Sequence, residues 1–214
     1  MSVKGKNRAI YSYTNDDRSG GNFMYKNFDK ANCYNSDFHG CNFDGASFRG
    51  TKLKFCNMKD SSFCGTEFIG TNVRGTRFNN SVFKNAVFNA TNMDRADFKG
   101  CSFYHCIFDG ASITKAKNIN IPEESNIIMT SGIVIPDSLL KCAEDIIKES
   151  PARNSVIQLK RGKINRITLL MLLYDFSEEE LVSYLPKAVY EAPSNCTISR
   201  LKKSLIKAKE ADNI

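Results

Sequence analysis

The chain has 214 residues, of which 42% are hydrophobic and 25% are charged, and its formal net charge is +7. This hydrophobic content excludes a wholly disordered chain, and the longest apolar run, 167–174, is too short to span a bilayer. The positive charge belongs to the first half: residues 21–117 hold thirteen Lys and Arg against eight Asp and Glu, whereas residues 118–214 hold thirteen of each.

Residues 1–20 are polar, mixed in charge and without a clear period. We expect them to form an N-terminal lead-in whose last residues cover the open end of the repetitive region that begins at residue 21. They also lack the apolar stretch of a signal peptide, which favours a cytoplasmic protein.

From residue 21 to residue 118, one class of residue returns every five positions. The recurring positions are Phe23, Phe28, Cys33, Phe38, Phe43, Phe48, Leu53, Met58, Phe63, Phe68, Val73, Phe78, Phe83, Phe88, Met93, Phe98, Phe103, Phe108 and Ile113. A period of five fits neither a helix nor a strand, so the chain must turn within each unit. Gly or Asn commonly lies two residues after each recurring position, as at Gly40 and Asn80, and these residues tolerate the positive φ of tight turns.

A longer period of twenty residues is superimposed on the period of five. Reading every fourth recurring position gives four columns, which we number as walls one to four, beginning at Phe23, Phe28, Cys33 and Phe38. Walls one and two contain only Phe, wall three has no aromatic residue, and wall four is mostly Phe. This pattern predicts a β-solenoid of nearly five coils, in which residues twenty apart stack along the axis at ~4.8 Å. Apart from Cys33, all the recurring positions are predicted core residues.

The five-residue units resemble the pentapeptide repeat family, whose units carry a small residue, a polar residue and then Phe or Leu. Examples are Ala46-Ser47-Phe48-Arg49-Gly50 and Ala96-Asp97-Phe98-Lys99-Gly100. The resemblance implies a right-handed quadrilateral β-helix, and it implies a fold more strongly than a function.

Five of the eight cysteines, Cys33, Cys41, Cys56, Cys101 and Cys106, fall at positions predicted to point inward. There they replace Ala, Ser and Thr as small hydrophobic residues, which indicates reduced thiols in a cytosolic protein. Cys101, His105 and Cys106 are the nearest approach to a metal cluster, and we interpret them as two core cysteines and a corner histidine. The sequence predicts no catalytic residue, metal site or cofactor, because a filled rod offers no cleft and no nucleotide-binding motif is present.

Two surface features of the rod are candidate binding sites. The residue before each recurring position is expected to face solvent, but Val82, Val87 and Ile107 are apolar there and form a candidate docking patch. The chain's own C-terminal helices are the favoured occupant of this patch. A basic surface on walls three and four and the corner between them comprises Lys52, Lys54, Lys59, Arg74, Arg77, Arg95 and Lys99. Asp37, Asp60, Asp94 and Asp97 interrupt this stripe of charge.

The remaining sequence changes to a helical pattern. Residues 119–135 are expected to cap the rod and link it to an α-helical region, 136–214. Helices are predicted from Pro136 to Ser150, over 164–174, from Ser177 with a capping box, and from about Thr197 to Ala211. Pro186 predicts a kink or an early stop in the third of these. The last two resemble a helix-turn-helix pair, although their connection is too long for the usual turn.

These features favour a non-catalytic protein–protein interaction or scaffold module, with an unidentified protein partner and a candidate homodimer contact through the helices. An adaptor, including a bacterial effector delivered into a host, fits the same features. The family resemblance raises a second function, DNA mimicry that protects gyrase from quinolones, but mimicry needs a negative rod. The third is nucleic-acid binding by the basic surface or the last helix, which we rank below the interaction module. No membrane association is expected.

Overall fold

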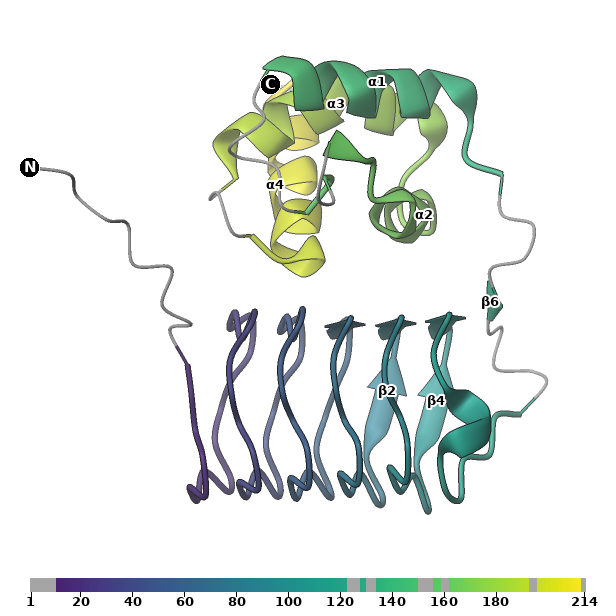
Figure 1. Cartoon of the computed structure of the whole chain (residues 1–214). Helices are drawn as coiled ribbons and strands as arrows, with labels where there is room; N and C mark the ends of the chain where they lie inside the picture. Colours follow the sequence, from purple (N-terminus) through teal and green to yellow (C-terminus); the bar gives the residue numbers. More distant parts are fainter. Residues whose placement is uncertain are drawn as a thin grey trace, which may run out of the picture. The chain divides into compact units, whose positions relative to one another are not determined.

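The structure is a computed structural model of the whole chain, and it describes residues 11–122, 128–129, 134–149, 156–158, 162–192 and 196–212. The chain divides into two compact units, Met1–Thr130 and Ser131–Ile214. The first unit is a β-solenoid and the second is helical (Figure 1).

The solenoid turns at every fifth residue. Each residue at a multiple of five from 15 to 110 has a positive φ, between 48° and 74°. Most of these corners are Gly or Asn, for which the left-handed region costs little. Tyr25, Lys30, Phe55, Ala90, Arg95 and His105 adopt the same conformation without that advantage. The period therefore imposes the corner even where the local residue resists it.

Between the corners, the chain forms short parallel ladders with the residue twenty positions later. β1 (Glu67–Ile69), β3 (Val87–Asn89), β5 (Ile107–Asp109) and β6 (Ile128–Met129) make one parallel sheet in that order. β2 (Val82–Lys84) and β4 (Ser102–Tyr104) make a second sheet. Elsewhere single bridges continue the pattern, such as Asp37↔Asn57 and Asn57↔Arg77. The twenty-residue register predicted from the columns is confirmed.

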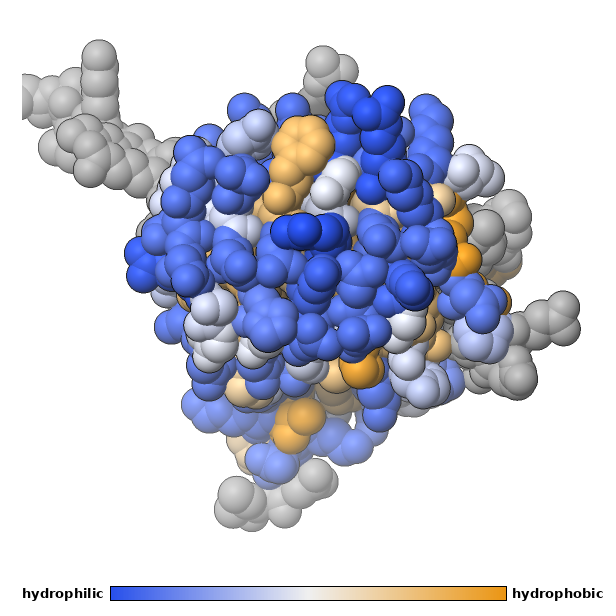
Figure 2. Space-filling view, turned by 90° about the horizontal axis from the view of Figure 1, so that it is seen from below, coloured by the Kyte–Doolittle hydropathy of each residue, from blue (hydrophilic) through white to orange (hydrophobic). Residues whose placement is uncertain are grey.

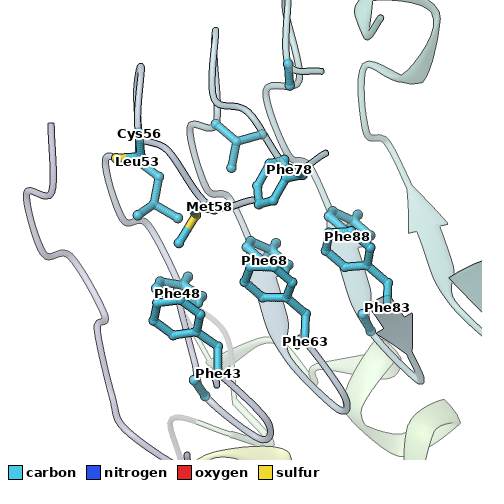
Figure 3. Packing of buried hydrophobic residues seen from close by; sticks show 14 of the residues in the cluster. Phe43, Phe48, Leu53, Cys56, Met58, Phe63, Phe68, Phe78, Phe83 and Phe88 are labelled. Atoms are coloured by element: carbon cyan, nitrogen blue, oxygen red, sulfur yellow. The ribbon is translucent and has the colours of Figure 1, made fainter. Parts of the chain in front are cut away.

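The interior is filled by stacked phenylalanine rings. In wall one, the ring centroids of Phe43 and Phe63 lie 5.4 Å apart and those of Phe63 and Phe83 4.8 Å apart, with interplanar angles of 6° and 7°. Wall two repeats this arrangement, with Phe68 and Phe88 at 4.9 Å and 2° (Figure 3). All the recurring positions from Phe23 to Phe108 are buried, and Ile113 packs against them from a partly buried position. Wall three, with Leu53 and Val73, supplies the narrower side chains beside them.

Where the small residue two positions before a recurring residue carries a hydroxyl or a thiol, it bonds the backbone of the preceding coil. Thr51 Oγ1 donates to the carbonyl of Phe28 at 2.6 Å, and Thr71 Oγ1 donates to that of Phe48 at 2.6 Å. Cys56 Sγ makes the same contact with the carbonyl of Cys33 at 2.6 Å. These cysteines therefore replace Ser and Thr as hydrogen-bond donors as well as filling space, a role that their interpretation as small hydrophobic residues missed.

The solenoid begins earlier than the sequence analysis expected. Asn15 N–H bonds the carbonyl of Tyr34 at 3.0 Å and Gly20 N–H bonds that of His39 at 2.7 Å, so residues 15–20 already pair with the next coil. Tyr13 takes the inward position twenty residues before Cys33, and the guanidinium of Arg18 lies 4.6 Å from its ring centroid. The expected boundary of the lead-in at residue 20 is therefore too late. Arg18 occupies the recurring position five residues before Phe23, where its charged end can reach solvent because it lies at the end of the rod. This polar residue hid the period in the sequence.

At its other end the solenoid closes with a 3₁₀ helix, Ile113–Lys115. Lys117 still bridges to Asp97, and Ile119 and Ile121 pack against the core from partly buried positions. β6 then adds a further strand beside β5. Residues 119–122 and β6 thus cover the last coil.

The second unit contains four helices among its described residues: α1 (Asp137–Glu149), α2 (Arg166–Leu173), α3 (Glu178–Glu191) and α4 (Ile198–Ala211). α3 packs against α1 and α4, and α2 contacts both α3 and α4. Ser177 forms the predicted capping box with Glu180, and Thr197 caps α4 by accepting from Arg200 N–H. The apolar face of each helix supplies this unit's core, for example Leu139, Leu181 and Leu201.

α3 corrects the expected stop at Pro186, because the helix continues to Glu191. Proline removes one backbone donor, which in a helix would bond the carbonyl four residues earlier, that of Val182. Cys142 Sγ on α1 lies 3.9 Å from this carbonyl and donates to it. Burial of Leu185 and Val189 on either side of Pro186 also holds the helix together. Tertiary contacts therefore offset the local penalty.

Candidate interaction surface

The basic surface is assembled by the register of walls three and four. Lys52 lies in the outward row Asn32–Lys52–Asn72–Asn92, and Arg77 lies in the row Asp37–Asn57–Arg77–Asp97. Lys54 and Arg74 follow the inward residues of wall three, and Lys59 and Lys99 follow those of wall four. Arg95 occupies the corner between the two walls, with φ of +57°. Lys52, Arg77, Arg95 and Lys99 are exposed, and the other three are partly exposed.

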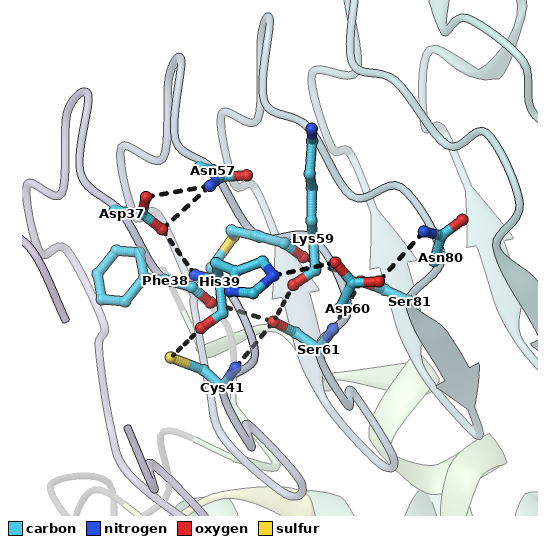
Figure 4. A network of polar contacts seen from close by, with 11 residues as sticks. Asp37, Phe38, His39, Cys41, Asn57, Lys59, Asp60, Ser61, Asn80 and Ser81 are labelled. Carbon is cyan, nitrogen blue, oxygen red and sulfur yellow. Dashed lines mark hydrogen bonds and ion pairs between the residues drawn. The ribbon is translucent and has the colours of Figure 1, made fainter. Parts of the chain in front are cut away.

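The acidic residues that interrupt this surface are held by partners within the rod. Asp37 accepts from Asn57 Nδ2 at 3.1 Å, and Asp60 accepts from Asn80 Nδ2 at 3.1 Å (Figure 4). Asp60 Oδ2 also lies 3.1 Å from His39 Nε2, and Asp94 pairs with Arg74 at 3.0 Å. Each carboxylate is thus directed along the rod to a neighbouring coil.

Asp97 is held in the same way. Burial alone would raise its pKa, but the side-chain amides of Asn118 and Asn79 and the backbone N–H of Lys99 hold that pKa below its ordinary value. The Asn118 bond to the carboxylate measures 2.8 Å and the Asn79 bond measures 3.1 Å. Asp97 therefore stays ionised and satisfied without a cationic side chain from the basic surface.

The cations of this surface, in contrast, are mostly available to a partner. Of the seven, only Arg74 forms an ion pair with a carboxylate in the part of the chain that the structure describes. Seven cations against four carboxylates leave three positive charges on this surface. The asymmetry favours a negatively charged partner, since the acids are already hydrogen-bonded and the cations are available.

An exposed aromatic pair lies on the same two walls. Tyr34 and Phe55 are 42% and 45% exposed, and their rings meet edge to face with centroids 5.8 Å apart. Phe55 occupies the same corner as Gly75 in the next coil and Arg95 in the one after. A Cβ added to Gly75 would lie 2.6 Å from the Phe55 ring, so Gly75 leaves the space that this ring fills. The sequence analysis missed the pair, and its signal was a Phe where the corner pattern favours Gly or Asn.

The candidate apolar patch spans two neighbouring walls. Val87 and Ile107 are paired residues of β3 and β5, as expected from their spacing, and both are buried. Val82 belongs to β2 in the other sheet and is 41% exposed. Val87 and Ile107 thus lie side by side on wall two and Val82 lies on wall one, as their spacing predicts, and of the three only Val82 is exposed.

The histidines and cysteines do not combine into a site. His105 lies at an exposed corner, whereas Cys101 Sγ donates to the carbonyl of Phe78 at 3.0 Å and Cys106 Sγ to that of Phe83 at 3.5 Å. No group of three or more His, Cys, Asp or Glu that could hold a metal occurs among the described residues. Burial raises the pKa of Cys56 to about 12, and that of Cys106 to about 11, which disfavours the reactive thiolate.

Comparison with protein-family models finds one match, to the model described as a pentapeptide repeat region, over residues 36–117. The chain contains a pentapeptide repeat region. The match lies inside the solenoid and leaves the helical unit outside it. Together with the stacked twenty-residue columns, it confirms the family resemblance of the five-residue units. No curated protein matches the chain.

Several solved structures of pentapeptide repeat proteins are similar to this chain. One is from the thylakoid lumen of Arabidopsis thaliana, with 18% identity, a TM-score of 0.36, and coverage of 74% of this chain and 87% of that chain. A second, from the cyanobacterium Cyanothece, has 16% identity and a TM-score of 0.31, with coverage of 48% and 63%. HetL, involved in heterocyst differentiation regulation in the cyanobacterium Nostoc, has 16% identity and a TM-score of 0.28, with coverage of 56% and 64%. The pentapeptide repeat assignment rests on the family model and on the repeat itself.

Proposed function

We propose that this protein is a non-catalytic interaction module in which the pentapeptide repeat rod displays side chains in fixed rows to a partner. The observation that carries the proposal is the filled interior: stacked rings occupy walls one and two, so chemical diversity is confined to the outward rows. Such a rod adds binding surface coil by coil without rearranging its core. We also propose the right-handed quadrilateral form, with nearly five coils, that the family resemblance implies.

The state of the thiols supports a further part of this proposal, the location of the protein. All eight cysteines are free, and five of them lie in the solenoid as internal donors or core residues, which fits a reducing, cytoplasmic location. No helix among the described residues is long and apolar enough to cross a membrane. We assign partner binding to the rod. We propose self-association through α3 and α4 as a second interaction, because the apolar side chains of Val182 and Ile206 are exposed on these helices.

Affinity capture from native cytosol tests the module. The full chain is compared with a variant that carries Lys52→Gln, Arg77→Gln and Lys99→Gln, and with the matched control Lys84→Gln on wall one. We expect a partner that the wild type and the control retain and that the triple variant loses. Failure of every form to enrich a partner would contradict the proposal, and sedimentation of the free protein would separately measure self-association.

DNA mimicry at gyrase is the alternative that the family resemblance raises, and the charge of the rod disfavours it. A mimic must present a negative surface, whereas residues 21–117 carry thirteen Lys and Arg against eight Asp and Glu. We expect no protection of gyrase from a quinolone in a DNA supercoiling assay. Protection at stoichiometric protein would overturn this ranking.

A further inference from the structure

The exposed aromatic pair and the available cations occupy one continuous part of the rod. Phe55 lies between Lys54 and Cys56 in the chain, and its ring lies against Gly75 in the next coil. Lys52 is exposed on the wall that ends at this corner, and Arg77 is exposed on the wall that begins there. Planar apolar rings are thus flanked by positively charged side chains on both walls.

Exposed aromatic side chains in a basic surface have a definite binding chemistry. Aromatic rings stack on the faces of unpaired bases, while Lys and Arg neutralise the phosphates on either side of them. A folded acidic protein would use the same cations, and half-exposed rings such as those of Tyr34 and Phe55 also occur in protein interfaces, so the experiment includes an acidic polypeptide as competitor. Figure 2 shows one face of the molecule, on which hydrophilic side chains predominate and isolated hydrophobic ones, including an aromatic ring, lie among them.

We propose that Tyr34, Phe55 and the basic surface bind single-stranded nucleic acid, which rests on the interaction-module function above and names the partner's chemistry. Coils ~4.8 Å apart place residues 34 to 99 over roughly 15 Å of the rod axis. This length accommodates a short stretch of a single strand. Because the carboxylates of this surface are tied to Asn, His and Arg side chains, they offer little competition for the phosphates.

The test is fluorescence anisotropy of the full chain with labelled oligo-dT and oligo-U of about twenty nucleotides, titrated between about 50 and 200 mM salt. Wild-type protein is expected to bind both single strands with an affinity that falls as salt rises. The triple variant Lys52→Gln, Arg77→Gln and Lys99→Gln should bind more weakly. The slope of log affinity against log salt concentration should be smaller by about 2. The variant loses three cations, and each cation that neutralises a phosphate contributes roughly 0.7 to this slope for a single strand.

The aromatic variants separate stacking from charge. Phe55→Ala and Tyr34→Ala should each weaken binding roughly tenfold with an unchanged salt slope, because stacking does not release counterions. Phe55→Ala should fold normally, since Ala90 already occupies an equivalent corner with a φ of +48°. Lys84→Gln, on wall one, is the matched control and should leave the affinity unchanged.

Three results would overturn the proposal. One is equal binding of single strands by wild type, Phe55→Ala and Tyr34→Ala. A second is complete competition by polyglutamate of the same charge, which would assign the surface to an acidic protein. In that case the affinity capture described above would still recover a partner, so this inference can fail while the interaction module stands. A duplex that binds as well as the single strands would also contradict base stacking.

Discussion

Phe63 lies midway along wall one and is fully buried. Its ring stacks on Phe43 below and Phe83 above, at centroid distances of 5.4 and 4.8 Å. Phe63→Ala removes this ring and leaves a cavity between two stacked neighbours. We expect the free energy of unfolding of the rod to fall by about 3–5 kcal/mol, the usual cost of truncating a buried Phe.

Two other phenylalanines provide the comparison. Phe23 is 9% exposed at the end of the column and stacks only on Phe43. The rings of Phe23 and Phe63 each make four aromatic contacts, so the difference rests on burial. Phe23→Ala should cost less than Phe63→Ala because its side chain lies at the end of the rod, where the cavity can relax. Phe55→Ala removes an exposed ring and should cost less than about 1 kcal/mol.

Urea titration followed by hydrogen–deuterium exchange mass spectrometry measures these effects, because it reports peptides of the rod separately from those of the helical unit. If Phe63→Ala does not fold, Phe63→Leu retains most of the buried volume and should still cost about 1 kcal/mol. Equal losses for the exposed Phe55 and the buried Phe63 would refute the reasoning, because burial and stacking would then not determine the stability of the column.

Three further changes test the corners, the thiols and the hydroxyl bonds. Ala90 and Gly50 both have a positive φ, so Ala90→Gly should raise the free energy of unfolding by about 1 kcal/mol and Gly50→Ala should lower it by about the same amount. The Cβ added at Gly50 has room, so the backbone conformation alone is tested. The midpoints of urea unfolding measure both changes. Burial raises the pKa of Cys56 from 9.0 to about 12, so its contribution to stability is complete below pH 9 and is lost as the pH rises toward 12; Cys56→Ser should make the loss of stability over this range smaller. Thr71→Val removes the bond to the Phe48 carbonyl and should cost about 1 kcal/mol, whereas Thr71→Ser should retain it, as calorimetry can show.

Much of the architecture is determined by spacing along the chain. The repeat of Phe every five residues specified four columns, and the structure stacks Phe43, Phe63 and Phe83 within one of them. Ser177 and Thr197 specified two helix starts, because each supplies a side-chain acceptor for an otherwise unpaired N–H of the first turn. Such features are readable because the partner lies at a fixed separation in the sequence.

Only the tertiary structure decided which surface groups are available. Whether Asp97 opposes a cation or is held by Asn79 and Asn118 depends on side-chain directions across three coils, which the repeat period does not encode. The unexpected corner at Phe55 likewise depends on a Gly twenty residues later leaving space for the ring. The basic surface was visible as charge, but its available cations and its aromatic pair were not.

The amino-acid order by itself determined the solenoid, its filled core and the helical character of the second unit, because repeated burial at a constant interval permits one arrangement. The folded chain decided how local penalties are offset: Cys142 supplies a donor to the Val182 carbonyl, for which Pro186 has no N–H, and the coil register holds Ala90 and Phe55 at a positive φ. These outcomes depend on interactions between residues distant in sequence, whose free energy exceeds the intrinsic preference of any single residue.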